Sequence, residues 1–204
     1  MADFQDPKVR APRKYGAIPA DKFSYILAEG APNTRPTAQG SNAALAEVSS
    51  FGILGCLFIL AGATVRCLFT LPEGMRRDAP LYLRVVYATA GVTAADTITW
   101  KVFYEKFLEG VALSATVNDV LDTVIAEDTT GTTTAYAVLK SPWGVINANK
   151  FDDNTTTIIL EVELDATAID IAGSEYTYML ALEYAYEAQK EVNVGTDDAL
   201  AAPA

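Results

Sequence analysis

The sequence predicts an all-β protein, a β-sandwich of eight strands preceded by an extended N-terminal arm. Half of the 204 residues are hydrophobic and only 20% are charged, a composition that favours half-buried strands over solvated helices. From about residue 51 onward, short apolar segments alternate with turn-forming residues, which is typical of a sandwich or barrel. The first 40 residues, in contrast, are interrupted repeatedly by proline.

The predicted arm covers residues 1–45. Each of its prolines disfavours helix at and before its own position, so the arm is expected to run extended. It also carries too many aromatic and aliphatic residues for a segment that stays in water, so we expect it to dock on a protein surface. Forty extended residues reach at most about 130 Å, far enough for that surface to belong to a neighbouring subunit. Packing of the arm on its own domain is the alternative.

The sandwich domain is predicted to cover residues 46–190, and an acidic tail, residues 191–204, ends the chain. Turn chemistry such as Pro72-Glu73-Gly74 and Ser141-Pro142 separates the strands. One short helical turn is expected between Trp143 and Phe151. The eight expected strands are Phe51–Leu60, Ala63–Leu71, Leu81–Thr89, Thr97–Phe107, Thr116–Ala126, Thr133–Leu139, Thr156–Leu164 and Glu175–Glu187.

Three of these strands show a period of two, which assigns their side chains to opposite faces. In the seventh strand, Glu161, Glu163 and Asp165 are expected to form a solvated face. Two inward-facing apolar sets make a sandwich core. In each of the three strands, one set of side chains is expected to share a face: Ile158, Leu160, Val162 and Leu164 in the seventh; Ile98, Trp100, Val102 and Tyr104 in the fourth; and Tyr176, Tyr178, Leu180, Leu182, Tyr184 and Tyr186 in the eighth.

Charge separates the arm from the rest of the chain. Residues 1–40 contain six Lys/Arg and four Asp/Glu, a charge of +2, whereas the remaining residues contain nine and twenty-two, a charge of −13, which together give the net −11. An acidic body repels phosphate backbones, so we expect no binding to nucleic acid. The first residues contain no apolar export signal, which predicts synthesis in the cytoplasm.

The segment between Glu47 and Arg66 contains no charged residue and reaches the lower length limit of a membrane-spanning helix. Glycines interrupt it, and its apolar centre has only the length of a strand, so a buried hairpin is favoured over a membrane segment. Cys56 and Cys67 belong to this region. We expect two small buried hydrophobic residues here rather than a disulfide, because no secretory signal is present.

The residue types needed for most catalytic sites are missing. The chain contains no histidine, which excludes Ser-His-Asp and Cys-His nucleophile pairs and the usual zinc sites, and it contains no phosphate-binding glycine loop. We therefore expect no enzymatic activity and no cofactor or metal. Asp152-Asp153-Asn154 is interpreted as a turn rather than a calcium site, and the tyrosine stripe of the last strand as core rather than a sugar-binding platform.

From about Ala63 to Glu187 the sequence resembles the jelly-roll domain of virion proteins of tailed bacteriophages, including trimeric head decoration, or cement, proteins. The segments that carry the resemblance are TVRCLFTLPEGM, LYLRVVYATAGVTAADTITWKVFYE and EYTYMLALEYAYE. The resemblance implies a jelly-roll fold, a homotrimer and a place on the capsid surface of the virion. The proline-rich arm is not part of the common domain.

The leading hypothesis is therefore a capsid decoration protein whose arm binds the major capsid protein and staples neighbouring capsomers against the pressure of packaged DNA. Basic residues of the arm would meet an acidic shell, and its aromatic residues would fill pockets. The alternatives are a carbohydrate- or receptor-binding module of a tail fibre that uses Trp143, Tyr136 or Tyr104, and a virion protein inserted into a membrane through residues 48–65. The expected partner-binding residues of the arm are Phe4, Lys8, Arg10, Arg13, Lys14, Tyr15, Lys22, Phe23, Tyr25 and Arg35.

Overall fold

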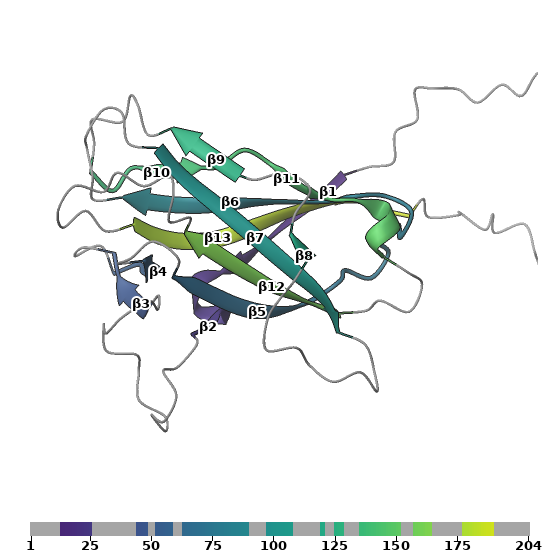
Figure 1. The fold of residues 1–204 in the computed structure, drawn as a ribbon, viewed down its shortest axis with the longest axis horizontal. Coiled ribbons are helices and arrows are strands. Elements are labelled where there is room, and N and C mark those ends of the chain that lie inside the picture. Colours follow the sequence, from purple (N-terminus) through teal and green to yellow (C-terminus); the bar gives the residue numbers. More distant parts are fainter. Residues whose placement is uncertain are drawn as a thin grey trace, which may run out of the picture.

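Two antiparallel sheets, here called sheet A and sheet B, pack face to face in the computed structural model (Figure 1). Among the described residues the remaining regular structure is two single-turn 3-10 helices, so the expected all-β sandwich is confirmed. The structure describes residues 13–25, 44–48, 52–58, 63–89, 97–107, 119–120, 125–128, 135–151, 157–164 and 177–189.

Sheet A has seven strands in the order β10-β6-β13-β4-β3, with β1 also paired to β13 and β11 also paired to β6. Strand β13 is central: β6 lies along one side of it, and β4 and β1 share the other side. The strands are β1 (Arg13–Pro19), β3 (Ala44–Glu47), β4 (Leu54–Phe58), β6 (Leu81–Thr89), β10 (Val138–Lys140), β11 (Gly144–Ile146) and β13 (Thr177–Glu187).

Sheet B has six strands in the order β2-β5-β12-β7-β8, with β9 also paired to β7. In Figure 1, β7 crosses in front of β6 and β13 of sheet A, and β12 and then β5 lie beside it. The 3-10 helix η1 (Ala20–Lys22) joins β1 to β2, and η2 (Ala148–Lys150) is the helical turn expected after Trp143. The strands are β2 (Ser24–Tyr25), β5 (Thr64–Thr70), β7 (Thr97–Phe107), β8 (Asp119–Val120), β9 (Ile125–Asp128) and β12 (Thr157–Leu164).

Six of the expected strands appear at their expected places as β4, β5, β6, β7, β12 and β13, and β6 and β7 have the expected bounds. The other two are wrong in extent: the described part of Thr116–Ala126 holds β8 and the start of β9, and the strand expected at Thr133–Leu139 begins only at Val138, after a turn. The hairpin expected between Glu47 and Arg66 is wrong, because β4 belongs to sheet A and β5 to sheet B. Cys56 and Cys67 therefore lie in opposite sheets, where both are buried and no disulfide joins them, as expected. Among the described residues, no helix has the length and apolar character needed to cross a membrane.

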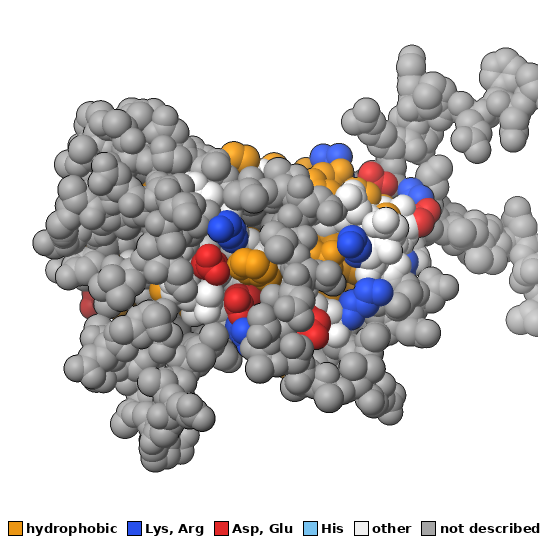
Figure 2. All heavy atoms as spheres, viewed as in Figure 1, with side chains coloured by type: hydrophobic (Ala, Val, Ile, Leu, Met, Phe, Trp, Pro, Cys, Tyr) orange, Lys and Arg blue, Asp and Glu red, His pale blue; other side chains and the backbone are white. Residues whose placement is uncertain are grey.

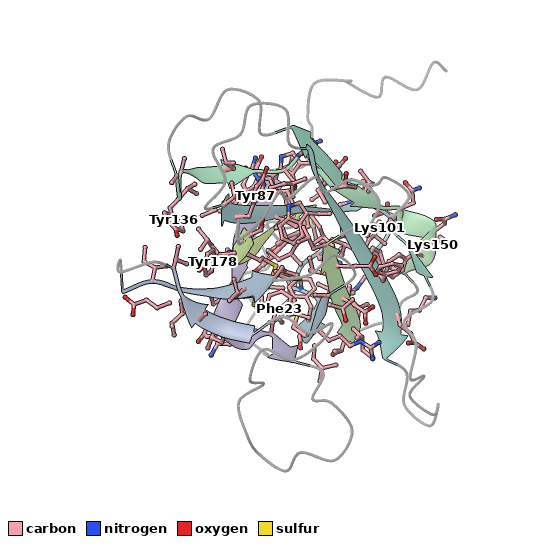
Figure 3. The ribbon with its side chains drawn as sticks, turned by 60° about the vertical axis from the view of Figure 1, so that its left-hand side comes forward. Phe23, Tyr87, Lys101, Tyr136, Lys150 and Tyr178 are labelled. Atoms are coloured by element: carbon pink, nitrogen blue, oxygen red, sulfur yellow. The ribbon has the colours of Figure 1, made fainter. Side chains whose placement is uncertain are left out.

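The core lies between the sheets and is built by the predicted alternation. Trp100 is fully buried, with its ring 5.2 Å from that of Phe58 and 5.6 Å from that of Tyr87, which points inward in Figure 3. The predicted inward sets of β7 and β12 are confirmed, since each of their eight side chains is at most 2% exposed. These sets come from neighbouring strands of sheet B and form one wall of the core.

Two details of the predicted faces are wrong. A register shift between Met179 and Ala181 breaks the alternation of β13, so Met179 and Leu182 share the main core while Tyr178 joins a second cluster on the opposite face of sheet A. The bulge thus divides the single stripe expected for this strand. Glu161, expected on a solvated face, is only 8% exposed, and its carboxylate accepts a hydrogen bond from the Arg66 guanidinium.

The arm boundary expected at residue 45 is also wrong for residues 13–25. Strand β1 is extended as predicted, but it pairs along its whole length with β13 of the same chain. Ile18, Ala20 and Phe23 enter the main core. Gly16 lies opposite Tyr184, and a Cβ atom at this position would meet the Tyr184 ring, so glycine leaves the space into which that ring packs.

Candidate functional site

The candidate site is the outer face of sheet A, where neighbouring strands place aromatic and charged side chains side by side. Along β1, Ile18 points into the core while Tyr15 and Ala17 are exposed. The register places Ala17 opposite Glu183 and Glu183 opposite Arg84. Trp143 precedes β11, which also pairs with β6, and its ring lies under the Arg84 guanidinium.

These side chains surround a hollow of about 390 Å³, which we call the Trp143 hollow. Its opening is aromatic on one side, because the Tyr15 and Trp143 rings are 6.4 Å apart and inclined at 51°. Tyr15 is 67% exposed, an unusual position for a large aromatic side chain. The residues that line the hollow are Tyr15, Gly16, Ala17, Arg84, Trp143, Glu183 and Tyr184.

Two of the lining residues, Arg84 and Glu183, belong to a charged network that also includes Lys140. Glu183 accepts hydrogen bonds from Arg84 at 2.6 Å and from Lys140 at 2.8 Å. Partial burial opposes the ionisation of Glu183, but the bonds from Lys140 and Arg84 outweigh it and lower the pKa of this carboxyl below its ordinary value. The Arg84 guanidinium also lies 4.2 Å from the centre of the Trp143 ring, so stacking and ion pairing together fix its orientation.

A second arginine–aromatic pair extends this face toward the start of β1, where the Arg13 guanidinium lies 4.9 Å above the Tyr82 ring. Rigid aromatic and arginine side chains on a firm sheet are typical of protein-binding surfaces, because little side-chain freedom is lost when a partner docks. Within the described ranges, no group of three or more Asp, Glu or Cys side chains is arranged to hold a metal ion. The aromatic and arginine side chains of this face are suited to contacts with a binding partner.

The structure separates the expected partner-binding residues of the arm. Arg13 and Tyr15 lie on the candidate face, and Lys14 is exposed on β1. Lys22 is exposed on η1 beside Asp21, whereas Phe23 is 3% exposed in the core. Tyr25 belongs to β2, opposite Val65. Four expected residues lie outside the described residues: Phe4, Lys8, Arg10 and Arg35.

The aromatic residues expected for a receptor-binding module are likewise separated. Trp143 lines the hollow, but Tyr104 is 1% exposed and belongs to the core. Tyr136 packs against Tyr178 in the second cluster, with 6.2 Å between ring centres, at the left edge of Figure 3. Sequence analysis missed Arg84, Lys140 and Glu183, because their meeting depends on the pairing of distant strands. The only available signal was their place on the less apolar face of each strand.

The opposite face of the sandwich has a different character. Figure 2 looks onto the sheet B side, where the described hydrophobic side chains lie among both acidic and basic ones. Leu68 on β5 is 64% exposed there, close to the Arg66–Glu161 ion pair.

Comparison with known proteins gives a likeness to solved structures but to no protein family. No protein-family model matches the chain, and no curated protein matches it. A similar solved structure is the K1 cleaved adhesin domain of Lys-gingipain from Porphyromonas gingivalis W83, which is 12% identical to this chain. The match covers 85% of this chain and 97% of that one, with a TM-score of 0.41.

Proposed function

We propose that the chain is a non-enzymatic virion structural protein that decorates the head of a tailed bacteriophage and binds its major capsid protein. The observation that carries the proposal is the rigid aromatic and charged face around the Trp143 hollow, which none of the described residues covers. The resemblance of residues 63–187 to phage decoration proteins supplies the biological setting. In this proposal the protein acts as a homotrimer on the capsid surface.

We further infer that the sandwich is a jelly roll. Eight successive strand positions run from β4 to β13, with β8/β9 and β10/β11 each taken as one, and consecutive positions lie in different sheets except the fourth and fifth, which are both in sheet B. Numbered one to eight, they give the orders 1-8-3-6 in sheet A and 2-7-4-5 in sheet B. Two interlocked Greek keys have this arrangement. Strands β1, β2 and β3 add to the edges of the two sheets.

The N-terminal segment has two parts in this proposal. Residues 13–25 belong to the sandwich and deliver Arg13 and Tyr15 to the docking face. Residues 1–12, which contain Phe4, Lys8 and Arg10, precede the start of β1 beside that face. Twelve extended residues reach about 40 Å, enough to contact a second capsid subunit. Threefold repetition would turn one weak contact into a durable attachment.

The test is binding to capsids of the encoding phage that lack this protein. We expect wild-type protein to co-sediment with them, Trp143→Ala to bind at least about tenfold more weakly, and a chain lacking residues 1–12 to bind more weakly as well. Leu68→Ala is the matched control, since it removes an exposed hydrophobic side chain from the other sheet. Absence of wild-type binding, or equal binding by the Trp143 and Leu68 variants, contradicts the proposal.

A second candidate function is binding of a carbohydrate receptor at the Trp143 hollow. The specific observation in its favour is the pair of inclined rings above an Arg84–Glu183–Lys140 network, because sugars stack on aromatic faces and exchange hydrogen bonds with charged groups. A glycan array distinguishes the two functions. Binding to a defined glycan that Trp143→Ala abolishes, with no binding to capsids, favours the receptor role.

A further inference from the structure

A second hollow, of about 380 Å³, lies beside the turn that joins β5 to β6. It is lined by Arg77 and Asp78 from the turn and by Ala148, Asn149 and Phe151 in and after η2. In Figure 3 the neighbouring Lys150 extends outward at the right and marks the position of η2. Phe151 is only 7% exposed, so one wall of the hollow is an extension of the core.

The turn is held firmly to the end of β13. The Arg76 N–H donates to the Glu187 carbonyl at 2.9 Å, and the Gln189 N–H donates to the Gly74 carbonyl at 2.7 Å. Met75 is 1% exposed and anchors the turn in the core. The hollow therefore has a fixed shape, and a ligand would find its walls already in place.

The two neighbouring arginines of the turn differ in their partners. Arg76 donates to both carboxylate oxygens of Asp78, at 2.9 and 2.5 Å, and reaches Glu187 at 3.4 Å. The bond from Arg76 holds the pKa of Asp78 below its ordinary value, so this carboxyl stays ionised and paired with Arg76. Asp78 and Glu187 are thus already engaged by one guanidinium.

Arg77 has no such partner among the residues that the structure describes. Its Nη1 atom is buried and makes no hydrogen bond with any described residue, and its side chain lines the hollow. The buried Nη1 atom offers no surface to a ligand, so an acceptor in the hollow would pair with the part of the Arg77 side chain that lines it. The planar fork of arginine matches the two oxygens of a carboxylate, and the Asn149 amide on the facing wall adds a further donor.

We propose that this second hollow, which we call the Arg77 hollow, is a carboxylate-binding site. Arg77 donates to the carboxylate, Asn149 supplies an additional hydrogen bond, and Phe151 packs against the carbon chain of the ligand. The carboxylate has two possible sources. One is an acidic residue of another molecule, and the other is the tail of this chain, which follows Gln189 and contains Asp197 and Asp198. The site is independent of the Trp143 hollow and of the function proposed for it.

The first test is titration of the full-length protein with succinate at constant ionic strength, followed by ¹⁵N NMR of the Arg77 side chain and of the backbone amides of residues 148–151. We expect saturable shifts in the wild type and at least about tenfold weaker binding in Arg77→Gln. Arg77→Lys keeps the charge but loses the fork and should bind at intermediate strength. Lys22→Gln removes the same charge at the far end of β1 and should bind like the wild type.

The outcomes separate cleanly. The proposal is overturned if the NMR shifts caused by succinate persist unchanged in Arg77→Gln, or if inorganic phosphate binds more tightly than succinate. A full-length Asp197→Asn/Asp198→Asn variant identifies the source of the carboxylate. Tighter succinate binding by this variant shows that the tail competes for the hollow, whereas unchanged binding assigns the site to another molecule. No succinate binding in either the wild type or this variant refutes the site. Urea unfolding at an unchanged midpoint shows that each variant is folded.

Discussion

Phe23 decides whether residues 13–25 belong to the sandwich or to a free arm, so its replacement by alanine is the most informative single change. The side chain is 3% exposed in the main core, next to Ala20, whose carbonyl accepts a hydrogen bond from the Cys56 thiol at 3.5 Å. Truncation of a buried Phe to Ala costs about 3–5 kcal/mol. For a chain of this length that loss lowers Tm by roughly 6–20 °C.

The assay is urea unfolding of the isolated protein followed by tryptophan fluorescence, with calorimetry for Tm. Tyr15→Ala is the matched control, because Tyr15 is another aromatic of the same segment but is 67% exposed. Its replacement should change the free energy of unfolding by less than about 0.5 kcal/mol. If Phe23→Ala is equally mild in the isolated protein yet weakens capsid binding, then Phe23 is a partner anchor and its placement in the core is wrong.

Three further predictions follow from single contacts. Gly16→Ala should destabilise the fold by about 1–3 kcal/mol in urea unfolding, because the new Cβ displaces the Tyr184 ring. The loss should be smaller in a Tyr184→Leu background. A neutral effect would show that β1 is not docked as described. Burial, reinforced by Cys56, raises the pKa of Cys67 to about 12. The unfolded chain therefore ionises this thiol at lower pH than the folded protein, so the free energy of unfolding should fall as pH rises above about 9. An equal fall in Cys67→Ala would contradict this origin. Because the pKa of Glu183 is lowered in the folded protein, its contribution to the free energy of unfolding is present at neutral pH and is lost as pH falls through the folded-state pKa. Wild type and Glu183→Gln should therefore differ in stability at pH 7 and converge in acid. A difference that stays constant with pH would argue against the ion-pair network.

The strands were predictable where one face is buried and the other is wet, because the alternation then repeats every two residues. The inward residues of β7, from Ile98 to Tyr104, follow this rule without interruption, and the bounds of β7 could be read from the chain. The absence of histidine likewise limits the possible site chemistry, because it removes whole classes of nucleophilic and zinc sites from the chain. Those inferences depend only on composition and on neighbours along the chain.

Pairing between distant strands could not be predicted in the same way. Apolar segments that follow one another, such as β4 and β5, can form a hairpin or cross to opposite sheets, and their local sequences favour both arrangements. The bulge in β13 is invisible to a strict period of two, because one added residue exchanges the faces of everything after it. The Arg84–Glu183 contact joins residues 99 positions apart, so only the tertiary register creates that part of the site.

The place of β1 changes what an N-terminal truncation can test. Removal of residues 1–40 would delete the strand that covers one side of β13, take Phe23 out of the core and remove Tyr15 from the docking face. Because the same truncation also removes residues 1–12, loss of capsid binding by that variant would not identify which of these changes caused it. Tyr15→Ala removes only the exposed ring, and a chain that begins at Arg13 removes only residues that precede β1. If both variants fold like the wild type and only the second loses its capsid, attachment depends on the leading residues, whereas the opposite result assigns attachment to the face of sheet A.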